Sequence, residues 1–409
     1  MSGLLSGVRV IEVALLAPDG LCMHLADLGA DVIKVEQPGL GDYVRSTGKS
    51  PSEDVSVLHR LWNRGKRSIT IDLRTPGGVE VFLDLAAGAD AVVEGLRPGS
   101  LARRGLGPDD LRRVNPRLVF ASICGFGQTG PYKDMPSHGI GFDAYGGLAP
   151  PVPGPNDWPS LPPDYLDVGT IAGPLYGALG VVAAILHSRT TGEPSTIDMA
   201  EADAAALWSA SRVTQAAARR ARGARGEKVE LAPHPGLAQG QNALTEDVRY
   251  QYYKCADGRH VLFMASERKF WENFGNAVGR PDIPVRYPSA EVADHMYGNR
   301  ELRAELVEIF ATRDQAEWVA LGMSANFPCV PGHVGGELLD DPQFQARTRW
   351  LPAEEHGIAF SATPIRSDPA LPDPRRAPTI GEHNDEILRT VLGYDDARVA
   401  SLHHDGVLG

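Results

Sequence analysis

Two acidic residues lie just ahead of a glycine-rich apolar segment, and this arrangement could support chemistry. Asp164 and Asp167 precede Ile171–Leu186, in which Pro174 is typical of the first turn of a helix. A carboxylate at a helix N-terminus is held ionised by backbone N–H groups and the helix dipole. Such a group could act as a nucleophile that both attacks and leaves, or it could simply cap the helix. Both roles stay open at this point.

Four basic residues at predicted strand ends form a second set: Lys66, Arg67, Arg97 and Arg103. Cationic side chains bind phosphates through charge-assisted hydrogen bonds, so these residues suit a phosphorylated ligand. Each residue taken alone is also explained as a solvated surface charge. Only their shared placement at strand ends favours a phosphate site.

Composition and motif content limit other kinds of chemistry. The 409 residues carry 40 basic and 52 acidic side chains, and the net charge of −12 opposes nucleic-acid binding over a broad surface. The 12 histidines form no HExxH motif, and four distant cysteines form no CxxC: Cys22, Cys124, Cys255 and Cys329. We therefore expect no metal site and a reduced, cytoplasmic protein. The N-terminus lacks a signal-peptide pattern and Ile171–Leu186 is short for a bilayer, so we expect a buried helix and no membrane span.

The elements that position these residues begin with alternating strands and helices. Strands are predicted at Gly7–Ala14, Asp31–Glu36, Ser68–Leu73, Ala91–Leu96 and Leu118–Gly125. Helices are predicted at Leu21–Leu28, Gly78–Ala87 and Pro108–Val114. This alternation predicts an α/β fold with a Rossmann-like parallel sheet in a large domain. No GxGxxG follows the first strand, so we expect no dinucleotide site.

The middle of the chain is predicted to be helical after a long loop. Gly139–Pro163 is rich in glycine and proline, and a loop of that length within a domain is usually functional or disordered. Long helices are predicted at Ile171–His187 and Met199–Arg222. The second ends in an arginine cluster that suits a solvated helix face. A loop-like segment, 222–246, then suggests a domain junction.

A smaller α+β domain is predicted over 245–335. It begins with a hairpin turning at Asp257–Gly258, followed by helices at Glu267–Val278 and about Arg300–Gly322. An aromatic stripe in the first of these helices is expected in the core of this domain rather than in an acyl pocket: Phe270, Trp271 and Phe274. The remaining residues are proline-rich and then helical at Asn384–Leu392.

Six segments, in order, resemble the family III CoA-transferases, which include formyl-CoA transferase, carnitine CoA-transferase and alpha-methylacyl-CoA racemase. They are Leu25–Asp42, Asn63–Leu73, Arg97–Gly107, Asn115–Tyr132, Ala178–Gly192 and Gly381–Tyr394. The resemblance extends from end to end of the chain. It implies a large CoA-binding domain built from both chain ends (1–222 and 336–409), a linker at 223–244 and a small domain at 245–335. It also implies two subunits threaded as interlocked rings, a homodimer or a heterodimer with a homologue.

The resemblance implies that one aspartate attacks the acyl-CoA donor to form a mixed anhydride. Counting forward from Gly146–Gly147 by the family spacing reaches Asp167, whereas counting back from the helix motif beginning at Ala178 reaches Thr170. An insertion of about three residues would reconcile the two registers. We favour Asp167, because a threonine forms no anhydride. Asp164 is the weaker local alternative.

His138 occupies the position of the catalytic histidine in the racemase branch and of an active-site tyrosine in formyl-CoA transferase. A histidine and an aspartate on opposite sides of an α-carbon could move its proton from one face to the other. The next residue, Gly139, departs from the racemase pattern, which has an aspartate there. A contact with the acyl group, or a purely structural role, is therefore the alternative.

The resemblance also implies CoA contacts. It implies that the first strand-to-helix turn contacts the pantetheine through Val13, Ala14, Leu15 and Ala17. The four basic residues named above are expected to contact the phosphates. Gly95 and Leu96 stand where formyl-CoA transferase has Asn-Phe beside the adenosine, and Gln37 replaces its adenine-side arginine. The adenine contacts must therefore differ. A further segment, His234–Gly236, lies where the family has a mobile glycine-rich loop.

Three hypotheses follow. The first is a CoA-transferase that acts on an acyl-CoA and a carboxylic acid. The second is an acyl-CoA racemase or isomerase that uses His138 and Asp167. The third is a non-catalytic CoA-binding subunit paired with an active homologue, as the Thr170 register would permit.

Overall fold

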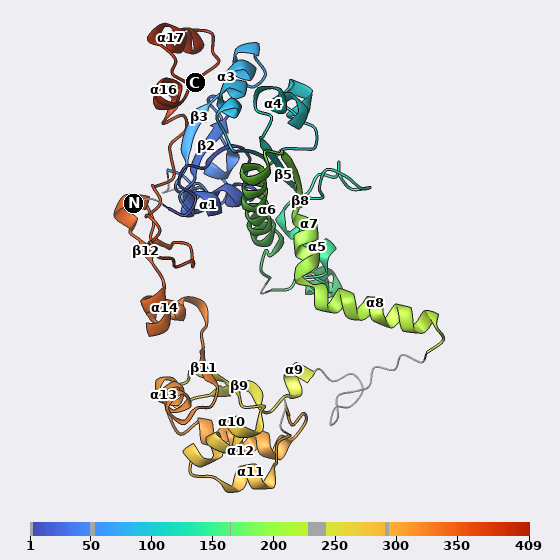
Figure 1. The fold of residues 1–409 in the computed structure, drawn as a ribbon. Coiled ribbons are helices and arrows are strands. Elements are labelled where there is room, and N and C mark those ends of the chain that lie inside the picture. Colours follow the sequence, from blue (N-terminus) through green and yellow to red (C-terminus); the bar gives the residue numbers. More distant parts are fainter. Residues whose placement is uncertain (1–2, 50–53, 164, 228–242, 291–293) are drawn as a thin grey trace. The chain divides into compact units, whose positions relative to one another are not determined.

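A six-stranded parallel sheet, with neighbour order β3-β2-β1-β4-β5-β8, organises most of the chain in the computed structural model (Figure 1). The structure describes residues 3–409 except 50–53, 164, 228–242 and 291–293. Its strands are β1 (Arg9–Val13), β2 (Asp31–Glu36), β3 (Arg67–Thr70), β4 (Ala91–Glu94), β5 (Val119–Cys124) and β8 (Ser195–Ala200). The predicted α/β fold with a parallel sheet is confirmed.

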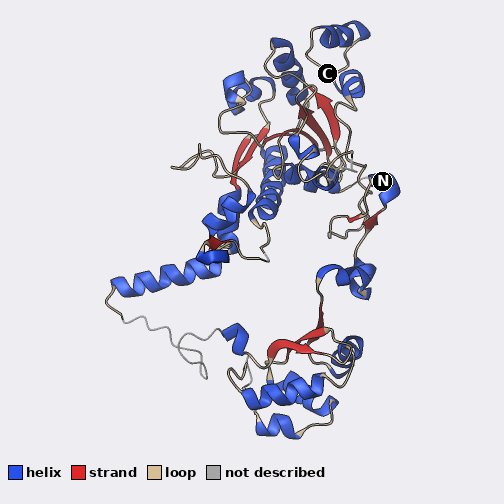
Figure 2. Ribbon diagram, turned by 180° about the vertical axis from the view of Figure 1, so that it is seen from behind, coloured by secondary structure: helices blue, strands red, loops and turns tan. Residues whose placement is uncertain are grey.

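Helices cover both faces of this sheet, as Figure 2 shows. The helices of this part are α1 (Asp19–Asp27), α2 (Val57–Trp62), α3 (Pro76–Ala87), α4 (Pro108–Val114), α5 (Gly139–Gly146), α6 (Gly169–Thr191), α7 (Glu201–Trp208) and α8 (Ala210–Ala224). Successive side chains of β1 point to opposite faces: Val10 joins a core formed with α1 and α6, and Ile11 joins a core formed with α3 and α4. Strands buried on both faces are typically continuous runs of valine and isoleucine, as here.

Contacts along the chain divide it into two compact units, 1–221 with 348–409, and 222–347. The C-terminal segment of the first unit is tied to β3. Thr70 N–H donates to Oδ1 of Asn384 at 2.8 Å, and Nδ2 of Asn384 donates back to Thr70 Oγ1 at 2.9 Å. This segment contains β12 (Trp350–Leu351), α15 (Ala353–His356), β13 (Phe360–Ser361), α16 (Asn384–Glu386), a π-helical turn (Ile387–Val391) and α17 (Asp396–His404).

The second unit is built on a three-stranded antiparallel sheet, in the order β11-β10-β9. Its elements are α9 (Ala243–Glu246), β9 (Tyr250–Lys254), β10 (His260–Met264), α10 (Arg268–Ala277), α11 (Asp282–Arg286), α12 (Arg300–Phe310), α13 (Gln315–Ala325), β11 (Cys329–Gly332) and α14 (Pro342–Arg347). The predicted hairpin is confirmed as β9 and β10. Trp271 and Phe274 are fully buried in its core, with Phe270 packed beside them, so the predicted core role of this stripe is confirmed.

Several predicted element boundaries were wrong. The helix expected at Met199–Arg222 is present as α7 and α8, with a break at Ser209, but its first two residues end the edge strand β8. Strand β8 was not predicted, because this half-exposed strand alternates polar and apolar residues too briefly to stand out. The helix expected over 300–322 is broken between α12 and α13, where Asp314 and Glu317 form a capping box. The expected loop at 139–163 contains α5 and the short strands β6 (Val152–Pro153) and β7 (Pro159–Ser160).

Helix α6 is the one helix of the described chain that is long and apolar enough to cross a membrane. It is 23 residues long, and half of its most apolar window is buried against its neighbours, including α1, α7 and β8. The core helix of a globular protein passes the same test of length and composition. The expected helix is therefore present, with its start at Gly169 rather than Ile171, but it is only half buried, and Ile171 and Leu179 are exposed.

Candidate active site

Two adjoining cavities lie at the carboxyl ends of the parallel strands. The larger cavity has a volume of about 1060 Å³ and the smaller cavity about 620 Å³. The residues that line both are Leu15, Tyr43, Leu96 and Arg104. Ligands of open α/β sheets bind in the crevice outside the carboxyl ends of the strands. These cavities are therefore the candidate site.

The first strand-to-helix turn forms a shared wall of the two cavities. Val13, Ala14 and Leu15 line the larger cavity, and Leu15 and Ala17 line the smaller one. Gly95 lets this turn approach the end of β4, since a Cβ at Gly95 would lie 2.6 Å from Cβ of Pro18 and 2.9 Å from Cβ of Ala14. The four residues predicted to contact the pantetheine, together with Gly95 and Leu96 from the adenosine side, are thus brought together.

Asp167 lies one turn ahead of a cavity-lining residue, Thr170, at the start of α6. Its side chain is half-buried, and its Oδ2 would lie 2.4 Å from a Cβ built on Gly139. Gly139 lines the smaller cavity, as do His138 and Thr170, whereas Asp167 stands directly behind them. The carboxylate therefore reaches the cavity wall because residue 139 has no side chain.

A hydroxyl and a second carboxylate fix the position of Asp167. The Tyr165 hydroxyl lies 2.8 Å from Oδ2 of Asp143 and 3.2 Å from Oδ1 of Asp167. Asp143, from α5, also accepts the Gly169 N–H at 3.1 Å, so it supplies the N-terminal cap of α6. The capping role that the sequence left open for Asp167 therefore belongs to Asp143, which leaves Asp167 free of that task.

Glu201 is a third carboxyl group of the site. It follows the last residue of β8, is 3% exposed and lines the smaller cavity. Burial, and then the charges of Asp167 and Asp143, raise the pKa of Glu201 to about 8. Cys124 also lines this cavity, and burial raises the pKa of its thiol to about 11. Neither Glu201 nor Asp143 was predicted; an acid directly after a strand of the sheet is the sequence signal that points to Glu201.

His138 lines the smaller cavity with an exposed side chain. It directly precedes Gly139, against which Asp167 packs. The structure therefore brings His138 and Asp167 to the same wall of the cavity. Asp164, the alternative carboxylate, and His234–Gly236 lie outside the described residues, as does most of the predicted linker.

Arginines and a lysine surround the smaller cavity. The exposed cations that line it are Arg97, Arg103, Arg104 and Lys133. Arg103 donates to Pro98 O and Ser100 Oγ, and Arg104 donates to Ser100 O. Within the described residues the Arg97 and Lys133 side chains form no ion pair, so both can turn toward an anion. Arg97 and Arg103 were predicted; Arg104 and Lys133 were missed because isolated cations in a loop carry no pattern.

Lys66 and Arg67 lie elsewhere, in contrast to the phosphate role expected from the sequence. Lys66 is 1% exposed, and its Nζ donates to Glu12 Oε1, Asp19 O and Asn63 Oδ1. Arg67 is paired with Asp31 at 2.7 Å and with Glu386 at 3.1 Å. Neither residue lines the cavities. Their hydrogen-bonding groups are occupied within the protein, so this placement speaks against direct contact with a phosphate.

A buried ionic cluster supports the wall of the larger cavity. Nζ of Lys34 lies 2.5 Å from Asp19 Oδ1 and 2.9 Å from Asp42 Oδ2, and it donates to Ala14 O. Lys34, Asp19 and Asp42 are all fully buried. Although burial opposes it, the charge of Lys34 lowers the pKa of Asp42 to about 2. The cluster therefore holds the turn after β1 and the loop after β2 in one arrangement.

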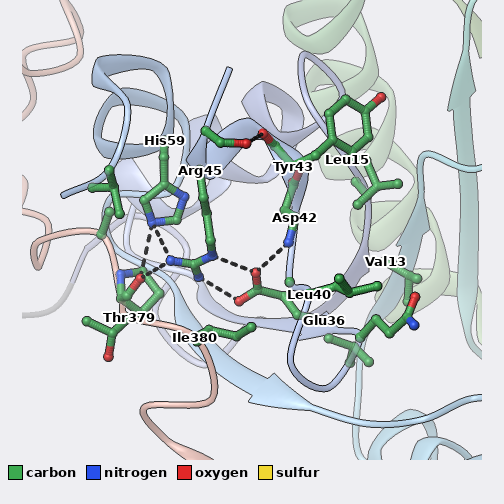
Figure 3. A pocket seen from close by; sticks show the side chains of 18 of the residues that line it. Val13, Leu15, Glu36, Leu40, Asp42, Tyr43, Arg45, His59, Thr379 and Ile380 are labelled. Atoms are coloured by element: carbon green, nitrogen blue, oxygen red, sulfur yellow. Dashed lines mark hydrogen bonds and ion pairs between the residues drawn. The ribbon is translucent and has the colours of Figure 1, made fainter. Parts of the chain in front are cut away.

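Figure 3 shows the polar side of the larger cavity, where Arg45 lies between Glu36 and His59. Nη2 of Arg45 donates to Glu36 Oε2 at 2.8 Å, and its Nη1 lies 3.0 Å from His59 Nε2. Burial, and then the charge of Arg45, lower the pKa of His59 to about 4, so this imidazole is neutral at pH 7. Apolar side chains of the same cavity, including Leu40 and Ile380, lie beside Glu36.

No group of three or more potential metal ligands occurs among the residues that the structure describes. The four cysteines are free, and three of them are buried. The site therefore offers carboxyl groups, one histidine and a rim of cations.

Comparison with known proteins identifies the class. Residues 5–384 match the model of CoA-transferase family III. The chain is 30% identical over 422 residues to a formyl-CoA:oxalate CoA-transferase of Rhodopseudomonas palustris (strain BisA53), covering 100% of this chain and 98% of the relative. It is 29% identical to human alpha-methylacyl-CoA racemase, covering 99% and 97%. Among solved structures, a CAIB/BAIF family protein from Brucella suis has a TM-score of 0.73 at 28% identity, covering 96% of this chain and 100% of that one.

The chain belongs to CoA-transferase family III, as its sequence segments indicated. It is an enzyme of the family III kind, and membership implies CoA-thioester substrates. Relatives of this chain include both transferases and a racemase.

Proposed function

We propose that this protein transfers CoA from an acyl-CoA donor to a carboxylic acid, with Asp167 as the nucleophile. The observation that carries the proposal is the contact of the Asp167 carboxylate with Gly139 at the wall of the smaller cavity. Of the acids gathered there, Asp167 is the one left to react, because Asp143 caps α6 and Glu201 has a raised pKa. Family membership supports the reaction class.

The two cavities fit a CoA thioester. The pantetheine would lie along the shared wall at Leu15 and Leu96. There, Gly95 has no side chain to keep the end of β4 away from the turn after β1. Arg97 and Arg104 would hold phosphates through charge-assisted hydrogen bonds. The larger cavity, lined by Gln37, would take the nucleotide end, and the acyl group would point to His138.

Asp167 divides the exchange into acyl transfers. Its carboxylate attacks the thioester carbonyl carbon, the C–S bond breaks, and the acyl group stays on Asp167 as a mixed anhydride while CoA leaves as the thiolate. The thiolate then attacks the aspartyl carbonyl, which releases the donor acid and leaves an Asp167 thioester. The acceptor carboxylate attacks this thioester to form a second anhydride and thiolate, and attack of the thiolate on the acyl carbonyl yields the new acyl-CoA and free Asp167.

The test is a panel of acyl-CoA thioesters and free acids scored by mass spectrometry. Asp167→Ala and Asp167→Asn should abolish exchange, whereas the exposed carboxylate of Asp203 on α7 gives a matched control, Asp203→Asn, that should keep it. Hydroxylamine added with acyl-CoA should leave a hydroxamate on the peptide that contains Asp167. Unchanged exchange in Asp167→Ala would refute the assignment. No turnover by the protein alone would favour the non-catalytic subunit.

A racemase or isomerase is the second candidate, since His138 lines the smaller cavity and the Asp167 carboxylate lies against Gly139 of the same cavity. It predicts deuterium uptake at the α-carbon of a 2-methylacyl-CoA in heavy water without any acid acceptor. Loss of this exchange in His138→Ala would support it. Absence of exchange in the wild type would remove it.

We also propose the assembly and the setting that the family resemblance implied. These are an interlocked homodimer, domain limits at 222, 245 and 336, and a cytoplasmic location. Light scattering of the purified protein tests the first, with a monomer as the contrary result.

A further inference from the structure

Glu201 sits at a position where a carboxyl group faces a cavity without a partner. It begins α7 directly after β8, and it is 3% exposed. Its Cγ would lie 2.8 Å from a Cβ built on Gly173, so it packs against the first turns of α6 beside Thr170. Glu201 and Thr170 both line the smaller cavity.

One carboxyl oxygen of Glu201 is unsatisfied within the described part of the protein. Oε1 is buried and has no hydrogen-bond partner in the described part of the chain. A buried polar atom left unpaired costs about 1–3 kcal/mol, so its retention beside a cavity indicates a partner supplied by a ligand. Glu201 therefore has both an open cavity and an unused polar group.

The surroundings favour the neutral acid. The titratable groups that act on Glu201 from the neighbouring elements are Asp143 of α5, Asp167 ahead of α6 and Cys124 at the end of β5, and His138 lines the same cavity. Asp203 lies on its own helix. Burial and like charges both disfavour the carboxylate form, and no cation of the described residues forms an ion pair with Glu201.

We propose that Glu201, as a neutral carboxylic acid, donates a hydrogen bond to the carbonyl oxygen of the bound acyl thioester. The role of this bond in catalysis rests on the function proposed above. When Asp167 adds to the carbonyl carbon, the C=O electron pair moves to oxygen, and the Glu201 O–H stabilises that oxyanion without giving up its proton. When the C–S bond breaks, the pair returns and the hydrogen bond persists with the anhydride carbonyl. A carboxylic acid held neutral can thus act as an oxyanion donor.

The pH dependence follows with a definite sign. The protonated form is the donor, and the pKa of Glu201 lies at about 8. The value of kcat/KM, which reports the free enzyme, should therefore fall as pH rises through about 8. The Cys124 thiol, with a pKa of about 11, does not account for such a fall.

The experiment compares Glu201→Gln, which keeps an N–H donor, with Glu201→Met, which removes the donor at similar volume. We expect Glu201→Gln to stay within about tenfold of wild-type kcat/KM at neutral pH and to lose the alkaline fall. We expect Glu201→Met to lower kcat/KM by about 10²–10³-fold, as for other oxyanion donors. Asp203→Asn on the same helix should match wild type in rate and pH profile.

Either of two results would overturn the proposal: wild-type kcat/KM in Glu201→Met, or an unchanged alkaline fall in Glu201→Gln. If Glu201→Met fails to fold, the wild type and Glu201→Gln still test the proposal. A wild-type kcat/KM that stays constant beyond pH 9 would contradict it. Infrared difference spectra provide a readout without turnover. A carboxylic-acid C=O band that disappears in the wild type near pH 8 should be missing in Glu201→Gln.

The two proposals fail separately. If Asp167→Ala loses exchange and the Glu201 variants are unaffected, only the proposed Glu201 hydrogen bond is refuted. An active Asp167→Ala with a Glu201-dependent profile removes only the nucleophile, since an α-proton transfer also needs the thioester carbonyl stabilised.

Discussion

Gly139→Ala should disable the enzyme while leaving its fold intact. The new Cβ would lie 2.4 Å from Oδ2 and 3.1 Å from Cγ of Asp167, and 3.0 Å from Cγ2 of Thr170. Ordinary carbon–oxygen contact requires about 1 Å more, so the carboxylate must move by roughly that distance. Asp is a short side chain, and the Tyr165 hydroxyl already fixes its other oxygen. The shift therefore falls on the reacting group.

The magnitude follows from the geometry of attack. A displacement of about 1 Å can lower a rate by roughly 10²-fold. We expect kcat to fall by about that factor, with KM for acyl-CoA within a few-fold, because Gly139 lies at the acyl end of the site. The backbone of residue 139 is not in the left-handed region, and alanine is the better helix former by about 0.5–1 kcal/mol, which offsets part of the crowding.

Gly141→Ala is the matched control. It lies in the same helix, α5, and a Cβ there has no atom within 4 Å. Steady-state exchange kinetics and thermal unfolding of both variants decide the matter. Wild-type kcat in Gly139→Ala, or an equal loss in Gly141→Ala, would contradict the placement of Asp167 at the reacting carbonyl.

Three further outcomes are expected. Lys34→Met should destabilise the protein by about 3–5 kcal/mol in urea unfolding, because it leaves Asp19 and Asp42 buried without their cation; a loss under 1 kcal/mol would contradict this. Lys66→Met should lower the unfolding temperature with little change in the KM for acyl-CoA. Arg97→Gln should raise this KM several-fold without changing the stability. The reverse pattern would restore Lys66 as a phosphate ligand. Since the native state of the wild type binds the Glu201 proton more tightly than the unfolded chain, its stability should fall between pH 4.5 and about 8, and Glu201→Gln should remove this slope in thermal unfolding; an equal slope in both proteins would contradict the raised pKa.

The sequence predicted the parallel sheet because its strands are buried on both faces. Val10, Ile11 and Val32 belong to runs that only a doubly covered sheet explains. The edge strand β8 was missed for the opposite reason: it has one neighbour, β5, and only its last residue, Ala200, is buried. Because β8 was not predicted, Glu201 was not recognised as an acid that directly follows a strand of the sheet.

Cations show where sequence reasoning about the site fails. Lys66 and Arg97 look alike in the sequence, since both follow or adjoin a predicted strand and both suit a phosphate. Only the fold distinguishes them. Glu12 is on β1, two strands from β3 in sheet order, and its carboxylate forms an ion pair with Nζ of Lys66 at 2.8 Å. The charge pattern of the sequence identifies the cations that could bind a phosphate. Burial against residues distant in the sequence decides which of these cations remain free to do so.

The buried cluster around Lys34 links the fold to the proposed chemistry. It joins Ala14 O, Asp19 and Asp42, which lie on the turn after β1, on α1 and on the loop after β2. Replacing such a cluster by apolar residues often stabilises a protein, so stability alone does not explain it. Its effect is to fix the turn after β1, the start of α1 and the loop after β2 at the carboxyl edge of the sheet, where Leu15 and Tyr43 line both cavities. Because a displacement of about 1 Å would lower the rate of the proposed attack by Asp167 roughly 10²-fold, a rigid wall for the proposed thioester site is worth more to this enzyme than a less polar core.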